Sequence, residues 1–120
     1  MPIEQSLNFL FWMLVMHAVA DYPLQGDWLT KAKNPFGEVA PVPGEEIWPG
    51  AMASHCLIHA AGVYWVTQTF ALAAAEFVMH YVIDLMKCYD AISYNEDQSL
   101  HVACKVAWTI ILYIMWLGKW

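Results

Sequence analysis

Apolar residues are concentrated in long stretches that polar segments separate from one another. A helix of about 20 apolar residues crosses the hydrocarbon core of a bilayer, because each residue adds about 1.5 Å along the helix axis. The pattern therefore predicts an all-α protein, a four-helix transmembrane bundle with up-down-up-down topology. The predicted spans lie at about residues 3–22, 51–68, 70–89 and 100–117.

The second and third spans are predicted from a single apolar region, residues 52–89, which is too long to cross a bilayer once. A polar trio, Thr67, Gln68 and Thr69, interrupts this region near its middle. We therefore expect two helices that are joined by a tight turn at the trio.

A loop at residues 23–50 joins the first two predicted spans. Its first part, GDWLTKAK, is predicted to form a short helix at the membrane interface. The rest is expected to be irregular, because prolines and glycines interrupt regular structure. The prolines of this loop include Pro35, Pro41, Pro43 and Pro49. Long loops without secondary structure tend to be functional or disordered.

The composition supports a membrane environment. The 120 residues are 60% hydrophobic and 13% charged, whereas about a quarter of the residues in a soluble domain are charged. This length predicts a single transmembrane domain, residues 1–120. The net charge of -6 excludes a nucleic-acid partner, which would require a basic surface. The N-terminal MPIEQS has no Lys or Arg, so we expect the first stretch to be kept as a span.

Every histidine of the chain has a histidine or an aspartate four residues away. This spacing places two side chains on one face of a helix. In an up-down-up-down bundle, one pair per helix would lie near the same membrane surface. The pairs are His17 with Asp21, His55 with His59, His80 with Asp84, and Asp97 with His101.

Eight potential ligands at one level predict a site for two metal ions. A single zinc ion needs three or four protein ligands, whereas two-metal bundles take one or two side chains from each helix. Five imidazoles and three carboxylates suit divalent transition metals (Zn, Mn or Fe) better than calcium or magnesium. The predicted ligands are His17, Asp21, His55, His59, His80, Asp84, Asp97 and His101.

Other interpretations of these residues explain less. A single His/Asp pair is more often structural than metal-binding, but four pairs reverse that balance. Haem ligation would use two histidines and leave the aspartates without a role. His55 and His59 have the spacing of the zinc ligands in a zinc protease, but Cys56 replaces the general-base glutamate of such an enzyme.

The cysteines are odd in number and lack CxxC spacing. This pattern predicts free thiols at Cys56, Cys88 and Cys104.

Three motifs resemble the domain of unknown function 3307 family. They are HAVADYPLQGDW from His17, HYVIDLMK from His80 and DQSLH from Asp97. The resemblance covers nearly the whole chain and implies a small polytopic membrane protein of bacteria or their phages, but it implies no reaction. The polar signature that it implies comprises His17, Asp21, Gln25, His80, Asp84, Asp97, Gln98 and His101.

The lysines are distributed unevenly between the two predicted membrane sides. Lys31, Lys33 and Lys87 lie on the side of the His/Asp pairs, against Lys119 on the opposite side. The positive-inside rule therefore places the site at the cytoplasmic face of the bacterial inner membrane, with both termini outside.

A two-metal centre at a membrane surface can lower the pKa of bound water to about 7 and hold a phosphoryl or carbonyl oxygen. The accessible substrates there are lipid headgroups and lipid-linked phosphates. We therefore expect a metal-dependent hydrolase of a lipid or lipid-linked (phospho)ester, with Gln25 and Gln98 hydrogen-bonded to the ligands or the substrate.

The alternative is a non-catalytic membrane subunit or phage accessory protein. Its metals would hold the helices together, and its apolar surface would bind a protein partner or a second copy. A metal or proton conduit is disfavoured, because the half of each predicted span away from the site is largely apolar.

Two charged residues are predicted to lie deeper than the site. Glu76 is four residues before His80 and Lys105 is four residues after His101, so both lie about 6 Å further into the bilayer. An unpaired charge there would cost about 2.5 to 3.5 kcal/mol. We expect Glu76 and Lys105 to pair beneath the metals. The alternative is a Lys105 that extends to the interface and a protonated Glu76.

Overall fold

The computed structural model describes residues 1–39 and 44–118. The described residues form five helices and no strand, which confirms the all-α prediction. Of the residues discussed above, Pro41, Pro43 and Lys119 lie outside the described part of the chain. The helices are α1 (Ile3–Asp21), α2 (Gly26–Ala32), α3 (Trp48–Thr67), α4 (Phe70–Cys88) and α5 (Tyr94–Leu117).

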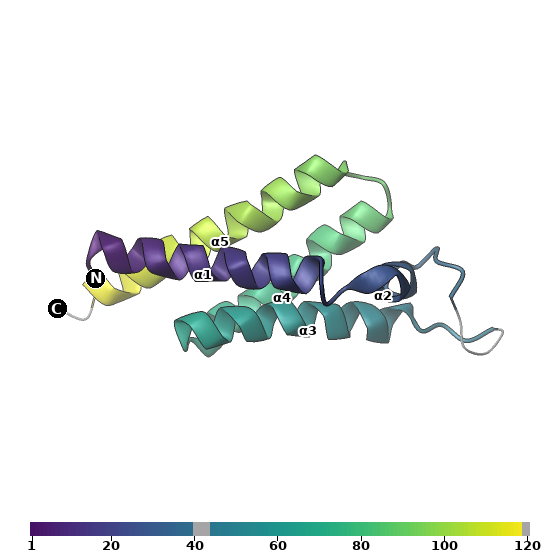
Figure 1. Cartoon of the computed structure of the whole chain (residues 1–120), viewed down its shortest axis with the longest axis horizontal. Helices are drawn as coiled ribbons and strands as arrows, with labels where there is room; N and C mark the ends of the chain where they lie inside the picture. The colour runs from purple at the N-terminus through teal and green to yellow at the C-terminus, as the bar shows by residue number, and fades with distance from the viewer. Residues whose placement is uncertain (40–43, 119–120) are drawn as a thin grey trace.

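The four long helices run in alternating directions along the molecule (Figure 1). Both α1 and α4 pack against α3 and against α5. The molecule is elongated, with principal extents of 57 × 25 × 22 Å. The N-terminus lies at the same end as the last turn of α5 (Figure 1).

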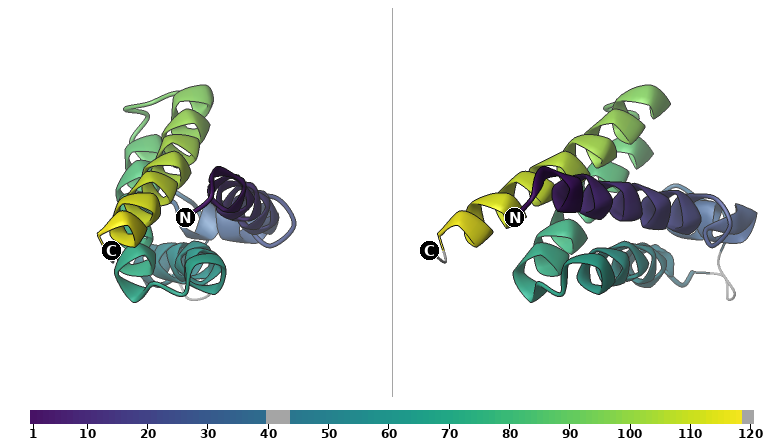
Figure 2. Two further views of the ribbon diagram at one scale, coloured as in Figure 1. Left: turned by 90° about the vertical axis from the view of Figure 1, so that its left-hand side faces the viewer. Right: turned by 60° about the vertical axis from the view of Figure 1, so that its left-hand side comes forward.

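The helices separate at the opposite end of the molecule. Figures 1 and 2 show α4 and α5 diverging from α1 and α3 toward the loop between α4 and α5. The short helix α2 follows α1 and packs against α3 at this end. The predicted short helix at GDWLTKAK is therefore confirmed. A cavity lined by residues of α2, α4 and α5 lies at this end.

The turn between α3 and α4 lies at the polar trio, as predicted. Gln68 adopts a left-handed backbone conformation with φ 52° and ends α3. Its side-chain amide donates to the Trp65 carbonyl oxygen at 2.8 Å, and the Thr69 hydroxyl donates to the Thr67 carbonyl oxygen at 3.0 Å. The trio therefore satisfies carbonyl groups that have no partner at the end of a helix.

The last helix, α5, begins at Tyr94, whereas the predicted apolar span begins at about residue 100. Its first turn is polar, so hydropathy did not mark it as part of the helix. Ser93 and Glu96 form a capping box: the Glu96 carboxylate accepts from the Ser93 backbone N–H at 2.7 Å, and the Ser93 hydroxyl accepts from the Glu96 N–H at 3.3 Å. As a result, His101 lies two turns inside a helix.

The start of α3 also differs from the prediction. The helix begins at Trp48 with Pro49 in its first turn, so the loop is shorter than residues 23–50. Proline is tolerated in the first turn of a helix. The backbone N–H groups of that turn have no partner within the helix, so the N–H group that proline lacks costs no hydrogen bond. Pro49 therefore belongs to the helix and does not interrupt it.

An apolar core lies between the four long helices, and each helix contributes one residue to it. These residues are Met13, Val63, Leu72 and Trp108. The contact between α1 and α3 is close at Gly62, where an added Cβ atom would lie 3.1 Å from Met16 Cβ. The absence of a side chain at Gly62 lets the two helix backbones approach.

Two described helices, α1 and α5, are long and apolar enough to cross a membrane, fewer than the four predicted. The other two do not reach this level. α3 carries His55 and His59, and α4 carries Glu76, Asp84 and Lys87. These residues lower the hydropathy of α3 and α4 although the helices have 20 and 19 residues.

Candidate metal centre

All eight residues that the sequence predicts as ligands lie together where the helices begin to diverge. They fall into three groups whose nitrogen and oxygen atoms lie within 4.8 Å of one another. His80 belongs to two groups and His101 also belongs to two, so the groups are continuous. The groups are Asp21, His55, His59 and His80; His17, His80 and His101; and Asp84, Asp97 and His101.

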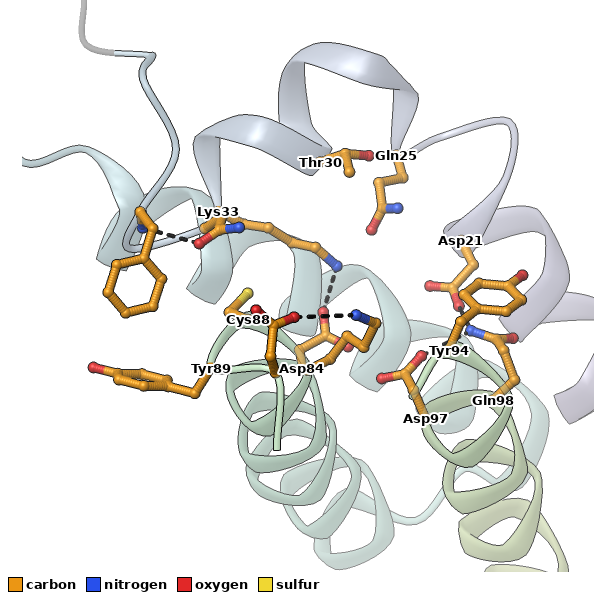
Figure 3. A pocket seen from close by; sticks show the side chains of 14 residues that line it. Asp21, Gln25, Thr30, Lys33, Asp84, Cys88, Tyr89, Tyr94, Asp97 and Gln98 are labelled. Carbon is orange, nitrogen blue, oxygen red and sulfur yellow. Dashed lines mark hydrogen bonds and ion pairs between the residues drawn. The ribbon is translucent and has the colours of Figure 1, made fainter. Parts of the chain in front are cut away.

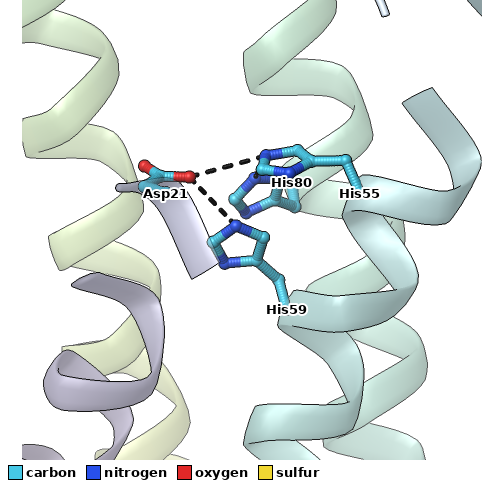
Figure 4. A group of neighbouring side chains, drawn as sticks. All are labelled: Asp21, His55, His59 and His80. Atoms are coloured by element: carbon cyan, nitrogen blue, oxygen red, sulfur yellow. Dashed lines mark hydrogen bonds and ion pairs between the residues drawn. The ribbon is translucent and has the colours of Figure 1, made fainter. Parts of the chain in front are cut away.

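The first group surrounds the carboxylate of Asp21, the last residue of α1 (Figure 4). Asp21 Oδ1 lies 3.0 Å from His59 Nε2 and 3.5 Å from His55 Nε2. His80 Nε2, from α4, lies 3.2 Å from His55 Nε2. Three helices therefore supply one imidazole–carboxylate cluster.

The remaining ligands extend this cluster toward α5. Asp84 Oδ1 lies 3.2 Å from His101 Nε2 and 3.5 Å from His80 Nε2. Asp97 Oδ1 lies 3.5 Å from His101 Nε2. The ring of His80 stacks against that of His101, with centroids 4.1 Å apart. The cluster thus reaches from α3 to α5 through α4.

The i,i+4 spacing produces contacts within each helix. His17 Nε2 lies 3.3 Å from Asp21 Oδ2, and the rings of His55 and His59 have centroids 4.6 Å apart. His80 with Asp84 and Asp97 with His101 are each in contact as well. The pairing within each helix could therefore be predicted from the sequence, and the packing of the helices brings the four pairs together.

The donor spacing fits metal coordination. Bonds of about 2.0 to 2.2 Å in a tetrahedral site place neighbouring ligand atoms about 3.3 to 3.6 Å apart. The closest contacts between nitrogen and oxygen atoms of the cluster are 3.0 to 3.5 Å long, and most of them exceed the usual N–H···O length of about 2.9 to 3.0 Å.

Several buried ligand atoms form no aligned hydrogen bond within the described residues. A self-sufficient hydrogen-bond network would leave few such atoms, because each one costs about 1 to 3 kcal/mol. The atoms are His17 Nε2, His55 Nδ1, His59 Nε2, Asp97 Oδ1 and His101 Nδ1. A metal ion would use the lone pairs of the atoms that face other ligands, namely His17 Nε2, His59 Nε2 and Asp97 Oδ1.

The charge of the site also fits a cation. The carboxylates of Asp21, Asp84 and Asp97 are buried or nearly so, and among the described residues Lys33 is the lysine in contact with them. With neutral imidazoles, three carboxylates and one ammonium leave a net charge of about -2 on largely buried side chains, which a bound cation would offset.

A buried ion pair lies one helical turn deeper. Lys105 Nζ donates to Glu76 Oε1, and both side chains are 1% exposed. The predicted pairing of these residues is therefore confirmed. Glu76 Oε2 also accepts from the Trp108 indole N–H at 2.7 Å. Glu76 Oε1 lies 3.3 Å from His80 Nδ1, which directs His80 Nε2 toward the cluster, as in carboxylate–histidine–metal arrangements.

The two glutamines occupy different positions. Gln98 donates to Asp21 Oδ2 and to Asp97 Oδ2, both at 3.1 Å, and so joins a carboxylate of α1 to one of α5. Gln25 precedes α2, and its Oε1 atom is buried without a hydrogen-bond partner in the described part of the chain. Gln98 thus positions ligands, whereas Gln25 retains an unused acceptor.

A cavity of about 600 Å³ opens directly above the cluster. Figure 3 shows α2 on one side and the ends of α4 and α5 on the other. Asp21, Asp84 and Asp97 belong to both the cluster and the cavity lining, and Gln25 and Gln98 also line it. A small molecule in the cavity would therefore contact the candidate metal ligands.

Sequence reasoning missed two side chains that contact the site. Lys33 was used only as a marker of membrane orientation, but its ammonium contacts Asp84. Nothing in the local sequence shows that α2 folds over the end of α4. Trp108 could have been found, because it lies three residues after Lys105 on the same helix face.

Together, the helical fold and the His/Asp cluster define a helical protein with a candidate metal centre. The chain belongs to the protein of unknown function (DUF3307) family, whose sequence profile it matches over residues 9–118. The resemblance noted from the three motifs is thereby confirmed. Comparisons with curated proteins and with solved structures gave no match.

Proposed function

We propose that this protein is a membrane-embedded, metal-dependent hydrolase of a lipid or lipid-linked (phospho)ester. The observation that carries the proposal is the convergence of eight histidine and aspartate side chains from four helices. Two divalent transition metals (Zn, Mn or Fe) are the proposed cofactors, because imidazole and carboxylate ligands in this ratio suit them.

The distribution of side chains supports the membrane environment. Charged and imidazole groups lie inside, whereas the outer faces carry large apolar side chains such as Phe11, Trp65, Phe70 and Ile110, which are 58%, 69%, 79% and 53% exposed. A soluble protein buries such side chains, but a lipid-facing surface consists of them. We therefore propose that all four long helices span the bilayer as one domain.

The cavity above the cluster favours catalysis. Bound metals would activate water and polarise a phosphoryl or carbonyl oxygen. Hydrolysis adds that water across the ester bond and releases an acid and an alcohol. In this proposal Gln98 holds Asp21 and Asp97 in place, while Gln25 forms a hydrogen bond to the substrate.

A non-catalytic role is the second candidate, and the small core favours it. The core cluster of the described chain contains four buried apolar residues with partly buried side chains around them, so metal ions would add cohesion to the helices. In that case the protein is a membrane subunit or phage accessory protein, and its apolar outer faces bind a protein partner or a second copy.

The first test is the metal content of protein purified in detergent after growth with Zn, Mn or Fe. We expect close to two ions per chain. The His59→Ala variant should lose metal but remain in the membrane fraction, because His59 lies inside the cluster rather than on the lipid-facing surface. Native protein without metal above background, even after supplementation, would contradict the proposal.

Chelation then separates catalysis from a structural role. For an enzyme, we expect a chelator to abolish hydrolysis of a lipid phosphoester while the helices stay folded, as judged by circular dichroism. Helices that unfold on chelation, in a protein that hydrolyses no member of a lipid ester panel, would instead identify the metal site as structural.

A further inference from the structure

The cavity wall formed by α2 differs chemically from the wall opposite. Gln25, Thr30 and Lys33 lie along α2 on one side of the cavity, facing the carboxylates of Asp84 and Asp97 (Figure 3). The α2 side supplies an ammonium and an amide, which bind anions. The other side supplies carboxylates, which bind cations. A metal-bound anion would fit between the two walls.

Lys33 contacts a predicted metal ligand in this structure. Its ammonium donates to Asp84 Oδ2, and its side chain is 11% exposed. Asp84 also forms one of the candidate ligand groups, with Asp97 and His101. Lys33 and a divalent cation therefore compete for the same carboxylate, because a positive charge weakens metal binding nearby.

The charge at the site reverses when two divalent ions bind. Three carboxylates and Lys33 have a net charge of about -2, and two divalent ions bring it to about +2. A phosphate group or phosphoester would neutralise this charge. Among the described cavity-lining residues, Lys33 and Lys87 are the lysines, and Lys87 pairs with the exposed Asp90. Lys33 is the one that contacts a candidate ligand, Asp84.

Building on the proposed metal-dependent function, we propose that Lys33 is an anion-binding residue that exchanges partners. It pairs with Asp84 when the metals are not bound. When metals bind Asp84, Lys33 turns into the cavity and binds the phosphate group of the substrate from the α2 side. Gln25, at the other end of α2, completes this anion-binding wall with its amide N–H groups.

The test measures metal and phosphate binding separately in the full chain in detergent. For the metal alone, Lys33→Met should bind more tightly, by about fivefold or more, because the competing charge is removed. Calorimetry with inorganic phosphate should then show that metal-loaded Lys33→Met binds phosphate about tenfold or more weakly than the metal-loaded native protein. The reason is that the variant lacks a charge-assisted hydrogen bond to the phosphate. If Lys33 had only a structural role, Lys33→Met would weaken both metal binding and phosphate binding.

Lys31→Met is the matched control. Lys31 lies in α2, two residues before Lys33, and carries the same charge, but it is exposed and does not line the cavity. Both affinities should stay within about twofold of the native values. Lys33→Arg keeps the charge and should retain most of the phosphate affinity; this variant also remains informative if Lys33→Met does not fold.

Absence of metal binding in the native protein would refute the proposed function itself. Metal binding with equal phosphate affinity in native and Lys33→Met protein would overturn only the role of Lys33. Phosphatidic acid in phosphatidylcholine nanodiscs identifies the source of the anion: competition with inorganic phosphate assigns the wall to a lipid headgroup. If only inorganic phosphate binds, the wall is assigned to a soluble phosphoester.

Discussion

Individual side chains show how ionisable groups are kept inside this helical protein. Glu76 contacts three partners: the Lys105 ammonium, the Trp108 indole N–H and the His80 ring. Each carboxylate oxygen is thereby used, and the charges of Glu76 and Lys105 cancel. This network lies beneath the candidate metal centre and fixes the ring of His80, which belongs to two of the ligand groups.

At this scale we predict strong coupling between Glu76 and Lys105. Glu76→Gln or Lys105→Met alone should lower the free energy of unfolding by about 3 to 5 kcal/mol, because each leaves an unpaired buried charge. The double variant should cost less than the sum of the two. Reversible unfolding in mixed micelles measures all three values.

Glu4→Gln is the control for this cycle, because Glu4 is exposed in the first turn of α1. Its effect should stay within about 0.5 kcal/mol. Additive effects of Glu76→Gln and Lys105→Met would show that the ion pair contributes no coupling.

At the scale of elements, the contact between α1 and α3 places ligands of both helices together. Gly62 lies three residues after His59, and Met16, its close neighbour across the contact, precedes His17. The Nδ1 atoms of His17 and His59 are 3.3 Å apart. The ligand geometry therefore depends on the separation of the two helices.

We predict that Gly62→Leu moves α1 away from α3 and weakens metal binding. Overpacking of this kind costs about 1 to 3 kcal/mol of stability, and it also separates His17 from His59. Metal titration and thermal unfolding in detergent measure the two effects. The matched control is Ala61→Leu, because Ala61 is the exposed neighbour on the same helix. Equal metal affinity in the two variants would disprove the role of this contact.

At the scale of the whole molecule, the divergence of α4 and α5 from α1 and α3 creates an open end and a closed end (Figure 2). The ligands and the cavity lie at the open end, and the apolar core lies toward the closed end. Lys31, Lys33 and Lys87 also belong to the open end. Under the proposal that the helices span a membrane, the positive-inside rule predicts that this end faces the cytoplasm.

Cysteine labelling checks this orientation. In a chain whose native cysteines are replaced by alanine, we expect Asp90→Cys, in the α4–α5 connection, to resist a membrane-impermeant maleimide in spheroplasts and to react after permeabilisation. Glu4→Cys, near the other end, should react in spheroplasts. The reverse pattern would place the site outside, and recovery of the chain without membranes would exclude the membrane proposal.

The sequence alone determined what depends on local spacing. The period of four placed each histidine beside its partner on one helix face, and the polar trio at 67–69 predicted the turn, because these are short-range properties of a helix. The burial cost of isolated charges predicted that Glu76 and Lys105 would pair. Hydropathy marked only the apolar part of α5, from about residue 100, because the capping box rather than apolar content begins that helix.

Only the tertiary structure decided what depends on distances between helices. It joined four ligand pairs into continuous groups, placed Gln98 between Asp21 and Asp97, and folded α2 so that Lys33 contacts Asp84. The hydrogen bonds and ion pairs that join these residues across different helices connect positions between 17 and 77 apart in the chain. Their geometry follows from helix packing and from the path of the loop, which no local pattern specifies.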